Sequence, residues 1–371
     1  MPHDILLLPG DGIGHEVMLE AEAIIAFLNE TGLADVRTER DLAGGTAYDA
    51  IGAPMSDATM AKALRCGTVL FGAVGGDQWD HVPYALRPEV AFMRLRKEMD
   101  LFANLRPAIC PPALAGASSL KAELVEGLDV MIVRELTGGV YFGEPKEIVT
   151  LENGRRRAVD TQCYDEDEIE RIARVAFDLA GKRQGRLASV EKSNVMKSGL
   201  LWRQTVTRMG REDYAGVDLR HLLADNCAMQ LVRMPKQFDV ILADNLFGDM
   251  LSDVAAMAAG SLGMLPSASL GVRDAAGRLP ALYEPVHGSA PDIAGKGIAN
   301  PIAMIGSLAM LLRHSLERED LAAALERAVS QVLDQGLRTG DIAPQGHVGV
   351  VGTRVMGSAI LDAFRGACER L

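Results

Sequence analysis

Residues 244–253, DNLFGDMLSD, place the strongest constraint on what this chain can fold into. The apolar segment FDVILA before them predicts a buried strand, and the segment from residue 250 onward predicts a helix. Asp249 and Asp253 are four residues apart, so on a helix their carboxylates project from one face. Neighbouring carboxylates repel each other, and Mg²⁺ or Mn²⁺ offsets that repulsion because hard cations prefer oxygen ligands. The alternative is an acidic helix start at which both side chains are solvated.

Length and charge bound the classes of protein that fit around this stretch. The chain has 371 residues, enough for two lobes, and its net charge of −12 disfavours nonspecific nucleic-acid binding. Five dispersed cysteines without CxxC spacing, and no apolar signal segment, predict a cytoplasmic protein with reduced thiols. The uncharged run at 254–272 contains glycines, serines and Pro266, so it predicts a buried helix end followed by a loop, not a membrane span.

The beginning of the chain follows the order of an α/β domain. A strand at 5–8 precedes the turn GDGIG, and apolar residues then recur at the helical spacing of Val17, Ala21, Ile24 and Leu28. A second apolar strand ends in glycines at 68–76. GDGIG lacks the GxGxxG spacing of a Rossmann fingerprint, so it is either a weak phosphate-binding turn or a simple tight turn.

Three arginines are candidates for binding an anion. Arg134 closes a buried strand, where a guanidinium is costly unless it meets a negative charge, and Arg106 lies in an extended segment before Pro107. Together with Arg96 they could bind two carboxylates in bidentate fashion. Alternatively, Arg94, Arg96 and Lys97 form a solvated helix face.

Two further charged residues follow predicted strands. Lys192 comes just after a strand at 187–190, but Glu191 and Lys192 could equally be a surface pair. Asp225 ends the segment HLLAD as a possible third metal carboxylate, or as the N-cap of the next helix. Helices are predicted at 165–183, where Asp165 and Glu168 suit a capping box, and at 302–316, 319–335 and 354–369. The segments 288–301 and 339–353 are predicted loops, the first being rich enough in small residues for its backbone to approach a ligand.

Five motifs together resemble the isocitrate/isopropylmalate family of β-decarboxylating dehydrogenases. They are LRKEMDLFANLRPA, VRELTGGVYFGEP, NLFGDMLSD, GSLGMLPSASLG and EPVHGSAPDIAGKGIANP, and the similarity runs nearly end to end. The resemblance implies an open α/β sheet in two domains without a standard Rossmann fold. It implies a dinucleotide-binding domain at 1–101 and 260–371, and a substrate, metal and dimerisation domain at 102–259.

The resemblance also implies roles for individual residues in an NAD-dependent oxidative decarboxylation. Arg96, Arg106 and Arg134 would bind the dicarboxylate substrate, while Tyr141 and Lys192 would act as acid and base. Asp225, Asp249 and Asp253 would hold Mg²⁺ or Mn²⁺, with Lys192 and Asp225 supplied by the partner subunit of a homodimer. NAD would be bound by Gly76, Glu89, His287, Gly288, Ser289, Ala290, Asp292, Ile293, Asn300 and Asp341.

The residues after Glu89 would face the variable substituent of the substrate. Phe92 and Met93 stand where the resemblance predicts two leucines, and Ala91 stands for a glycine, so the pocket stays apolar and favours an alkyl group. Tartrate, malate and homoisocitrate are the alternative substrates, and homoisocitrate would require a cation that faces its extra carboxylate.

A catalytically silent regulatory relative is a further alternative, although every implied catalytic position carries the expected residue type. For Asp292 the alternative to ribose binding is a cap on its own turn.

Overall fold

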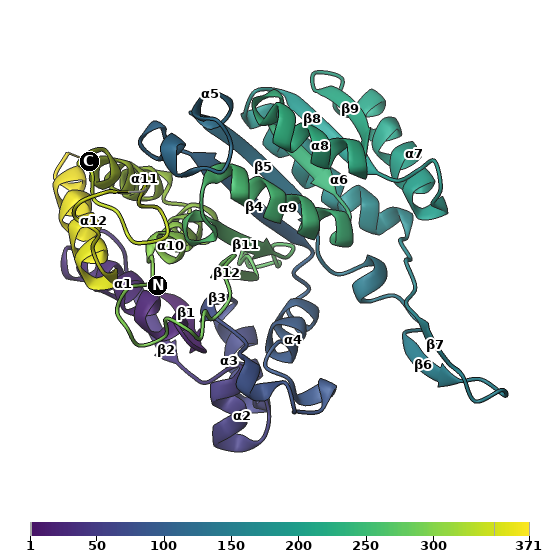
Figure 1. Ribbon diagram of the computed structural model, residues 1–371, viewed down its shortest axis with the longest axis horizontal. Coiled ribbons are helices and arrows are strands. Elements are labelled where there is room, and N and C mark those ends of the chain that lie inside the picture. Colours follow the sequence, from purple (N-terminus) through teal and green to yellow (C-terminus); the bar gives the residue numbers. More distant parts are fainter. Residues whose placement is uncertain (1, 345, 371) are drawn as a thin grey trace. The chain divides into compact units, whose positions relative to one another are not determined.

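The computed structural model describes residues 2–344 and 346–370. The chain divides into two compact units. The first comprises residues 1–101, 110–127 and 259–371, and the second comprises residues 102–109 and 128–258. Each unit is an α/β structure, which confirms the predicted fold class (Figure 1).

The first unit is built on strands in the order β2-β1-β3-β12-β11. β1, β2, β3 and β12 are parallel, and β11 is antiparallel to β12. The strands are β1 (His3–Gly10), β2 (Val36–Arg40), β3 (Thr68–Ala73), β11 (Pro266–Leu270) and β12 (Ala281–Pro285). β1 and β3 are buried almost throughout because they are continuous apolar runs with sheet neighbours on both sides.

Helices α1 and α10 pack on this sheet, and α11 and α12 pack against them in turn. Val17, Ala21, Ile24 and Leu28 of α1 are fully buried, as their spacing predicts. The α-helices of the unit are α1 (Gly14–Glu30), α2 (Gly45–Ile51), α3 (Asp57–Cys66), α4 (Val90–Glu98), α5 (Ala122–Val125), α10 (Ile302–His314), α11 (Glu319–Asp334) and α12 (Thr353–Cys368). Its short 3-10 turns are η1 (Asp77–Trp79), η2 (Tyr84–Leu86), η3 (Pro112–Ala117) and η6 (Leu262–Met264).

The second unit has strands in the order β4-β5-β10-β8-β9, of which β5, β10, β8 and β9 are parallel. They are β4 (Ala103–Cys110), β5 (Leu128–Glu135), β8 (Arg186–Glu191), β9 (Asp218–Leu223) and β10 (Val240–Ala243). The α-helices are α6 (Glu166–Lys182), α7 (Lys197–Glu212), α8 (Ala224–Arg233) and α9 (Asn245–Ala259). η4 (Gly139–Tyr141) and η5 (Pro235–Gln237) are short 3-10 turns. The predicted capping box of Asp165 and Glu168 begins α6.

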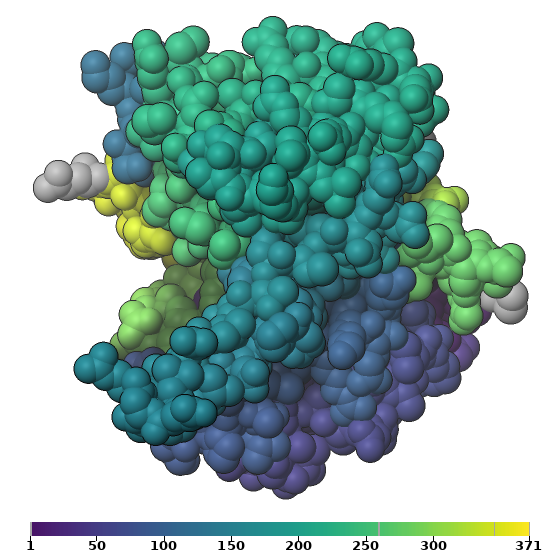
Figure 2. Space-filling model, turned by 90° about the vertical axis from the view of Figure 1, so that its right-hand side faces the viewer, coloured from purple at the N-terminus to yellow at the C-terminus, as the bar shows by residue number. Residues whose placement is uncertain are grey.

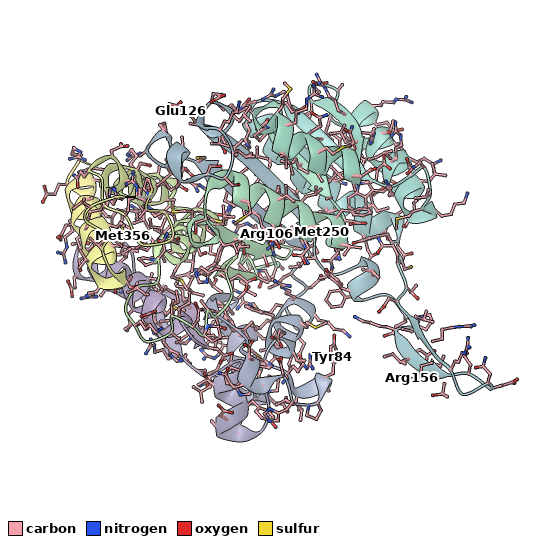
Figure 3. The ribbon with its side chains drawn as sticks, viewed as in Figure 1. Tyr84, Arg106, Glu126, Arg156, Met250 and Met356 are labelled. Carbon is pink, nitrogen blue, oxygen red and sulfur yellow. The ribbon has the colours of Figure 1, made fainter. Side chains whose placement is uncertain are left out.

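A separate antiparallel hairpin, β6 (Glu147–Thr150) with β7 (Arg156–Val159), extends from the second unit (Figure 1). Its side chains are mostly exposed, and Figure 2 turns this side of the molecule toward the viewer. Arg156 is labelled on β7 in Figure 3. The sequence does not indicate this hairpin, because neither EIVT nor RRAV alternates apolar and polar residues.

Two predictions about secondary structure were wrong. The segment 266–270 is the strand β11 and not a loop, because hydrogen bonds to β12 stabilise a sequence of small residues with low strand propensity. Asp225 neither ends a strand nor caps a helix: β9 ends at Leu223, Leu223 is the N-cap, and Asp225 lies in the first turn of α8.

Other predictions agree with the structure. The segment 288–301 contains no helix or strand, and 339–353 is a loop up to the start of α12 at Thr353, with Gln345 outside the described residues. None of the five cysteines, all of which lie among the described residues, forms a disulfide bond. Among the described residues, none of the helices is both long and apolar enough to cross a membrane.

Candidate functional site

Asp249 and Asp253 lie on α9, one turn apart, and both face the guanidinium of Arg106. Arg106 Nη1 is 3.5 Å from Asp249 Oδ1 and 3.8 Å from Asp253 Oδ1. The prediction that the two carboxylates share one helix face is therefore confirmed. Partial burial raises the pKa of the Asp253 carboxyl, the Arg106 guanidinium opposes that shift, and repulsion from Asp249 adds to it. These carboxylates thus lie where a positive charge stabilises them.

Arg106, which Figure 3 labels, lies on β4. Buried polar groups hold its guanidinium in place. Its Nε donates to Asn104 Oδ1 over 2.8 Å, and its Nη1 donates to Ser252 Oγ over 2.7 Å. Asn104 is completely buried, and Ser252 is nearly so. The guanidinium is therefore held by neutral partners while it faces the two carboxylates.

Arg134 lies near the end of β5 and is only 3% exposed. Its Nη1 forms an ion pair with Asp249, while its Nε and Nη2 donate to Asn245 Oδ1 over 3.0 and 2.8 Å. This buried strand-end arginine thus meets an anion, as its position required. Arg106 and Arg134 converge on the same carboxylate.

Tyr141 belongs to the same group of residues. Its hydroxyl donates to Asp249 Oδ2 over 3.2 Å, and its ring lies 5.8 Å from the Arg134 guanidinium carbon. Burial and the nearby Asp249 carboxylate raise the pKa of the Tyr141 hydroxyl above its usual value. Tyr141 therefore keeps its proton at neutral pH in this arrangement, although the same shift makes it a weaker acid.

Lys192 and Asp225 form a second group within the same unit. Lys192 Nζ lies 2.7 Å from Asp225 Oδ1, and this hydrogen bond holds the pKa of Asp225 below its usual range. Glu191 does not pair with Lys192: it is buried, accepts from Arg203 Nη1 over 3.0 Å, and accepts from the backbone N–H of Ser193. Glu191 thereby fixes the turn after β8 that presents Lys192.

The donor set of the predicted metal site is only partly assembled within one chain. Among the described residues, no group of three or more histidine, cysteine or acidic side chains could hold a metal ion. Asp249 and Asp253 supply hard oxygen donors beside each other, which fits Mg²⁺ or Mn²⁺, but Asp225 is engaged with Lys192. Asp249 and Asp253 therefore fit a cation whose further ligands come from other residues.

In the first unit, Arg96 pairs with a buried acid. Arg96 Nη2 donates to Glu284 Oε1 on β12 over 3.0 Å, so Arg96 does not belong to a solvated helix face. Arg94, by contrast, forms exposed pairs with Asp57 and Glu98. Phe92 packs on Phe71 with ring centroids 4.3 Å apart, and the Arg96 guanidinium carbon lies 5.4 Å from the Phe92 ring. Phe92 is consequently part core, whereas Met93 is half-buried without such stacking.

The turn GDGIG is tied to two of the loops predicted to bind a dinucleotide. Ser289 Oγ donates to the Gly75 carbonyl over 2.6 Å, and the Ser289 carbonyl accepts from Ile13 N over 2.9 Å. A Cβ at Gly12, where φ is +53°, would lie 2.1 Å from the Ser289 carbonyl oxygen, so this close approach requires glycine. Asp11 is buried and accepts from the backbone N–H groups of Gly45, Thr46 and Gly75. The GDGIG acid thus organises loops, as the tight-turn alternative implies.

Two other residues predicted to bind the dinucleotide contact each other. Asn300 Nδ2 donates to Asp341 Oδ2 over 3.0 Å, and Asp341 also accepts from Ser261 and Thr339. His287 Nδ1 lies 2.9 Å from the Gly288 carbonyl, and its buried Nε2 has no hydrogen-bond partner among the described residues.

Asp292 is exposed, and its carboxylate has no hydrogen bond or ion pair within the described part of the chain. That observation speaks against the turn-cap alternative, which requires a hydrogen bond to its own backbone.

The sequence analysis missed the amides beside the arginines. Asn104 and Asn245 each accept from a guanidinium Nε, and neither was singled out. In both cases the sequence shows an asparagine at one end of a largely apolar strand. Asn104 lies at the start of β4, and Asn245 follows β10.

Comparison with known proteins places this chain among the isocitrate/isopropylmalate dehydrogenases. The family model described as isocitrate/isopropylmalate dehydrogenase matches residues 4–360, so the chain belongs to that family. A protein of Rhizobium meliloti named 3-isopropylmalate dehydrogenase is 64% identical over 363 residues, which is 98% of each chain. A protein of Rhodopseudomonas palustris with the same name is 62% identical over 364 residues, again 98% of each.

Solved structures give the same family. An isocitrate dehydrogenase from Methylococcus capsulatus is similar with a TM-score of 0.84 and 33% identity, covering 98% of this chain and 99% of the other. A β-decarboxylating dehydrogenase from Thermococcus kodakarensis has a TM-score of 0.78 and 34% identity, covering 98% of this chain and 96% of the other.

Proposed function

We propose that this chain oxidises (2R,3S)-3-isopropylmalate to 4-methyl-2-oxopentanoate and CO₂, with reduction of NAD, as a cytoplasmic enzyme of leucine biosynthesis. The observation that supports this proposal most is the identity of 62 to 64% with proteins named 3-isopropylmalate dehydrogenase, over 98% of each chain. The order of motifs in the sequence agrees with it.

In this proposal Arg106 and Arg134, with Arg96, bind the two substrate carboxylates. Arginine suits this role because its planar fork donates two parallel hydrogen bonds to a carboxylate. In the present structure the carboxylate of Asp249 stands between Arg106 and Arg134, which supports an anion-binding role for both side chains. Asn104 and Asn245 hold the two guanidinium groups without adding a negative charge of their own.

Asp249 and Asp253, with Asp225 of a second subunit, would hold Mg²⁺ or Mn²⁺. A cation held there would lower the pKa of the substrate C2 hydroxyl and stabilise negative charge on that oxygen, and bound NAD would supply the hydride acceptor for C2. Lys192 takes the C2 hydroxyl proton, directly or through water. After loss of the 3-carboxylate as CO₂, Tyr141 would return a proton to C3, since its hydroxyl is protonated at neutral pH.

Binding of NAD is assigned to the first unit. The docking of Ser289 against Gly75, and of Asn300 against Asp341, joins three separate segments that the family resemblance implicates. Small residues let backbone groups in these segments approach a ligand closely.

A homodimer is proposed because α8, its C-cap residue Met234 and α9 expose large apolar side chains. Met229, Val232, Met234, Met250 and Met257 are each between 46% and 62% exposed. An unpaired apolar surface on a charged protein is typical of a protein interface. Such a dimer would let Lys192 and Asp225 serve the partner's site.

The apolar side chain of Met93, with the edge of Phe92, is proposed to contact the alkyl group of the substrate. Because Phe92 packs on Phe71, its position is more constrained than that of Met93. Homoisocitrate would need a cation opposite its extra carboxylate, and the sequence places apolar residues there.

An NADH-formation assay with 3-isopropylmalate and Mg²⁺ tests the proposed function. The expected result is a kcat/KM for 3-isopropylmalate at least about a hundredfold above those for malate, tartrate and homoisocitrate. Malate and tartrate leave the apolar pocket unfilled, and the apolar residues of the pocket provide no cation for the extra carboxylate of homoisocitrate. A higher kcat/KM for any of these alternatives would replace the proposed substrate. No turnover of any of them would favour a silent relative.

Cofactor choice gives the next prediction. Asp292 would accept hydrogen bonds from the adenosine ribose hydroxyls and repel a 2′-phosphate, so the wild type should prefer NAD to NADP by about a hundredfold or more. In the double variant Asp292→Lys/Ile293→Tyr this preference should shrink at least tenfold or reverse. The measurement is kcat/KM for both dinucleotides. A wild type that uses NADP as well as NAD would contradict the assignment, and Lys296→Ala in the same loop is the control.

A further inference from the structure

The side chain of Asn245 forms a neutral clamp on Arg134. Its Oδ1 accepts from both Nε and Nη2 of the arginine, over 3.0 and 2.8 Å. Asn245 is 1% exposed and Arg134 is 3% exposed, so both hydrogen bonds are shielded from water. The same edge of the guanidinium is held twice by one atom, which fixes the plane and direction of the side chain.

The clamp is itself fixed on its other side. Asn245 Nδ2 donates to the carbonyls of Leu136 and Gly138, over 3.1 and 3.0 Å. These two bonds assign Nδ2 as the donor end and therefore Oδ1 as the end that faces Arg134. All the hydrogen-bonding atoms of the amide have partners, so it has little freedom to turn away.

A buried chain of hydrogen bonds anchors the backbone of Asn245. Its N–H donates to the Tyr164 hydroxyl over 2.9 Å, and that hydroxyl donates to Glu135 Oε2 over 3.0 Å. Glu135 also accepts from Thr137 N and Gly138 N. The pairing of Ala243 with Arg134 in neighbouring strands places Asn245, two residues on, beside the arginine.

An amide at this position differs from a carboxylate in one respect that matters for anion binding. A carboxylate would make the same two hydrogen bonds but would also neutralise the guanidinium and add a second negative charge near Asp249. The amide holds the arginine without taking its charge. Asn104, also a neutral amide, accepts from Arg106 Nε over 2.8 Å, so the same kind of contact occurs twice in this group of residues.

From this geometry we infer that Asn245 is a positioning residue that aims Arg134 at a carboxylate of the substrate while preserving its charge. The inference rests on the proposed function to the extent that Arg134 binds substrate. Asn245 acts through Arg134, so its loss should weaken substrate binding and leave dinucleotide binding unchanged.

The test is a double-mutant cycle in the full-length enzyme. Asn245→Ala should raise the KM for 3-isopropylmalate roughly 10–100-fold, with the KM for NAD within about twofold of wild type. In an Arg134→Lys background the same change should add less than about threefold, because lysine lacks the Nε–Nη2 edge that Asn245 holds. Asn29→Ala, which removes two side-chain hydrogen bonds to Val36 in the first unit, is the control and should alter neither KM.

A second variant tests the charge, with its thermal midpoint measured beside KM to detect a folding defect. Asn245→Asp keeps the size of the side chain and an acceptor for Arg134 but loses the donor to Leu136 and Gly138. In folded protein it should raise the substrate KM at least about tenfold because it neutralises the guanidinium. An unchanged substrate KM in both variants, or effects that multiply fully in the double mutant, would overturn the positioning role. If the wild type turns over malate instead of 3-isopropylmalate, the proposed function fails, and the same cycle is then run with malate, which shares both carboxylates.

Discussion

Replacing Asp249 by Asn should lower kcat/KM for 3-isopropylmalate by about a thousandfold, since a bound divalent cation contributes several kcal/mol and each ~1.4 kcal/mol is tenfold in rate. Asp249 shares one face of α9 with Asp253. Its carboxylate forms ion pairs with Arg106 and Arg134 and accepts a hydrogen bond from Tyr141. Asparagine keeps the shape and one acceptor oxygen but removes the charge that a cation requires. The fold should persist, with a thermal midpoint within a few degrees of wild type.

Metal binding can be measured apart from turnover in this variant. A ligand that binds the folded state raises the thermal midpoint by mass action, so Mn²⁺ should stabilise the wild type and fail to stabilise Asp249→Asn. Asp218→Asn is a suitable control, because Asp218 is an exposed acid paired only with Arg220 in the described structure. Full activity of Asp249→Asn, or of the wild type in excess chelator, would remove the metal from the mechanism.

The shared face of Asp249 and Asp253 on α9 is a feature that the sequence alone predicts. The four-residue spacing of Asp249 and Asp253 is a local property of a helix, so the sequence was sufficient to place both carboxylates on one face. The capping box at Asp165 and Glu168 and the buried face of α1 were predictable for the same reason. Each depends only on residues within a turn or two along the chain.

Features that depend on distant segments were missed or misjudged. β11 has the sequence PSASL, which becomes a strand only because β12 pairs with it. The clamp of Asn245 on Arg134 depends on the pairing of β10 with β5, across more than a hundred residues of chain. The pairing of Lys192 with Asp225 likewise joins a turn after β8 to the first turn of α8. Residue types alone do not show which of these segments become neighbours.

The other large effect concerns the pair of Lys192 and Asp225, which contact each other. The remaining site residues form a group of their own: Arg106, Arg134, Tyr141, Asp249 and Asp253. Lys192→Ala and Tyr141→Phe should each lower kcat by about 10²–10⁴-fold as homodimers, because each removes a group that moves a proton. If Lys192 serves the partner's site, a hybrid dimer of the two variants has one site with both lesions and one site with neither. Random association of equal amounts makes half the dimers hybrids, so about one quarter of wild-type activity should return.

Hybrids of other pairs supply matched controls from the same two groups of residues. Lys192→Ala mixed with Asp249→Asn should also regain activity, because the two lesions again fall in one site. Lys192→Ala mixed with Asp225→Asn should regain no activity, because each site of that hybrid keeps one lesion. Tyr141→Phe mixed with Asp249→Asn should regain none for the same reason.

Differently tagged subunits, co-expressed and purified through both tags, verify that hybrids form. Verified hybrids of Lys192→Ala and Tyr141→Phe without recovered turnover would place Lys192 in the site of its own chain. Recovery in the Lys192→Ala and Asp225→Asn mixture would mean that these two residues, 2.7 Å apart in one subunit, do not serve the same site.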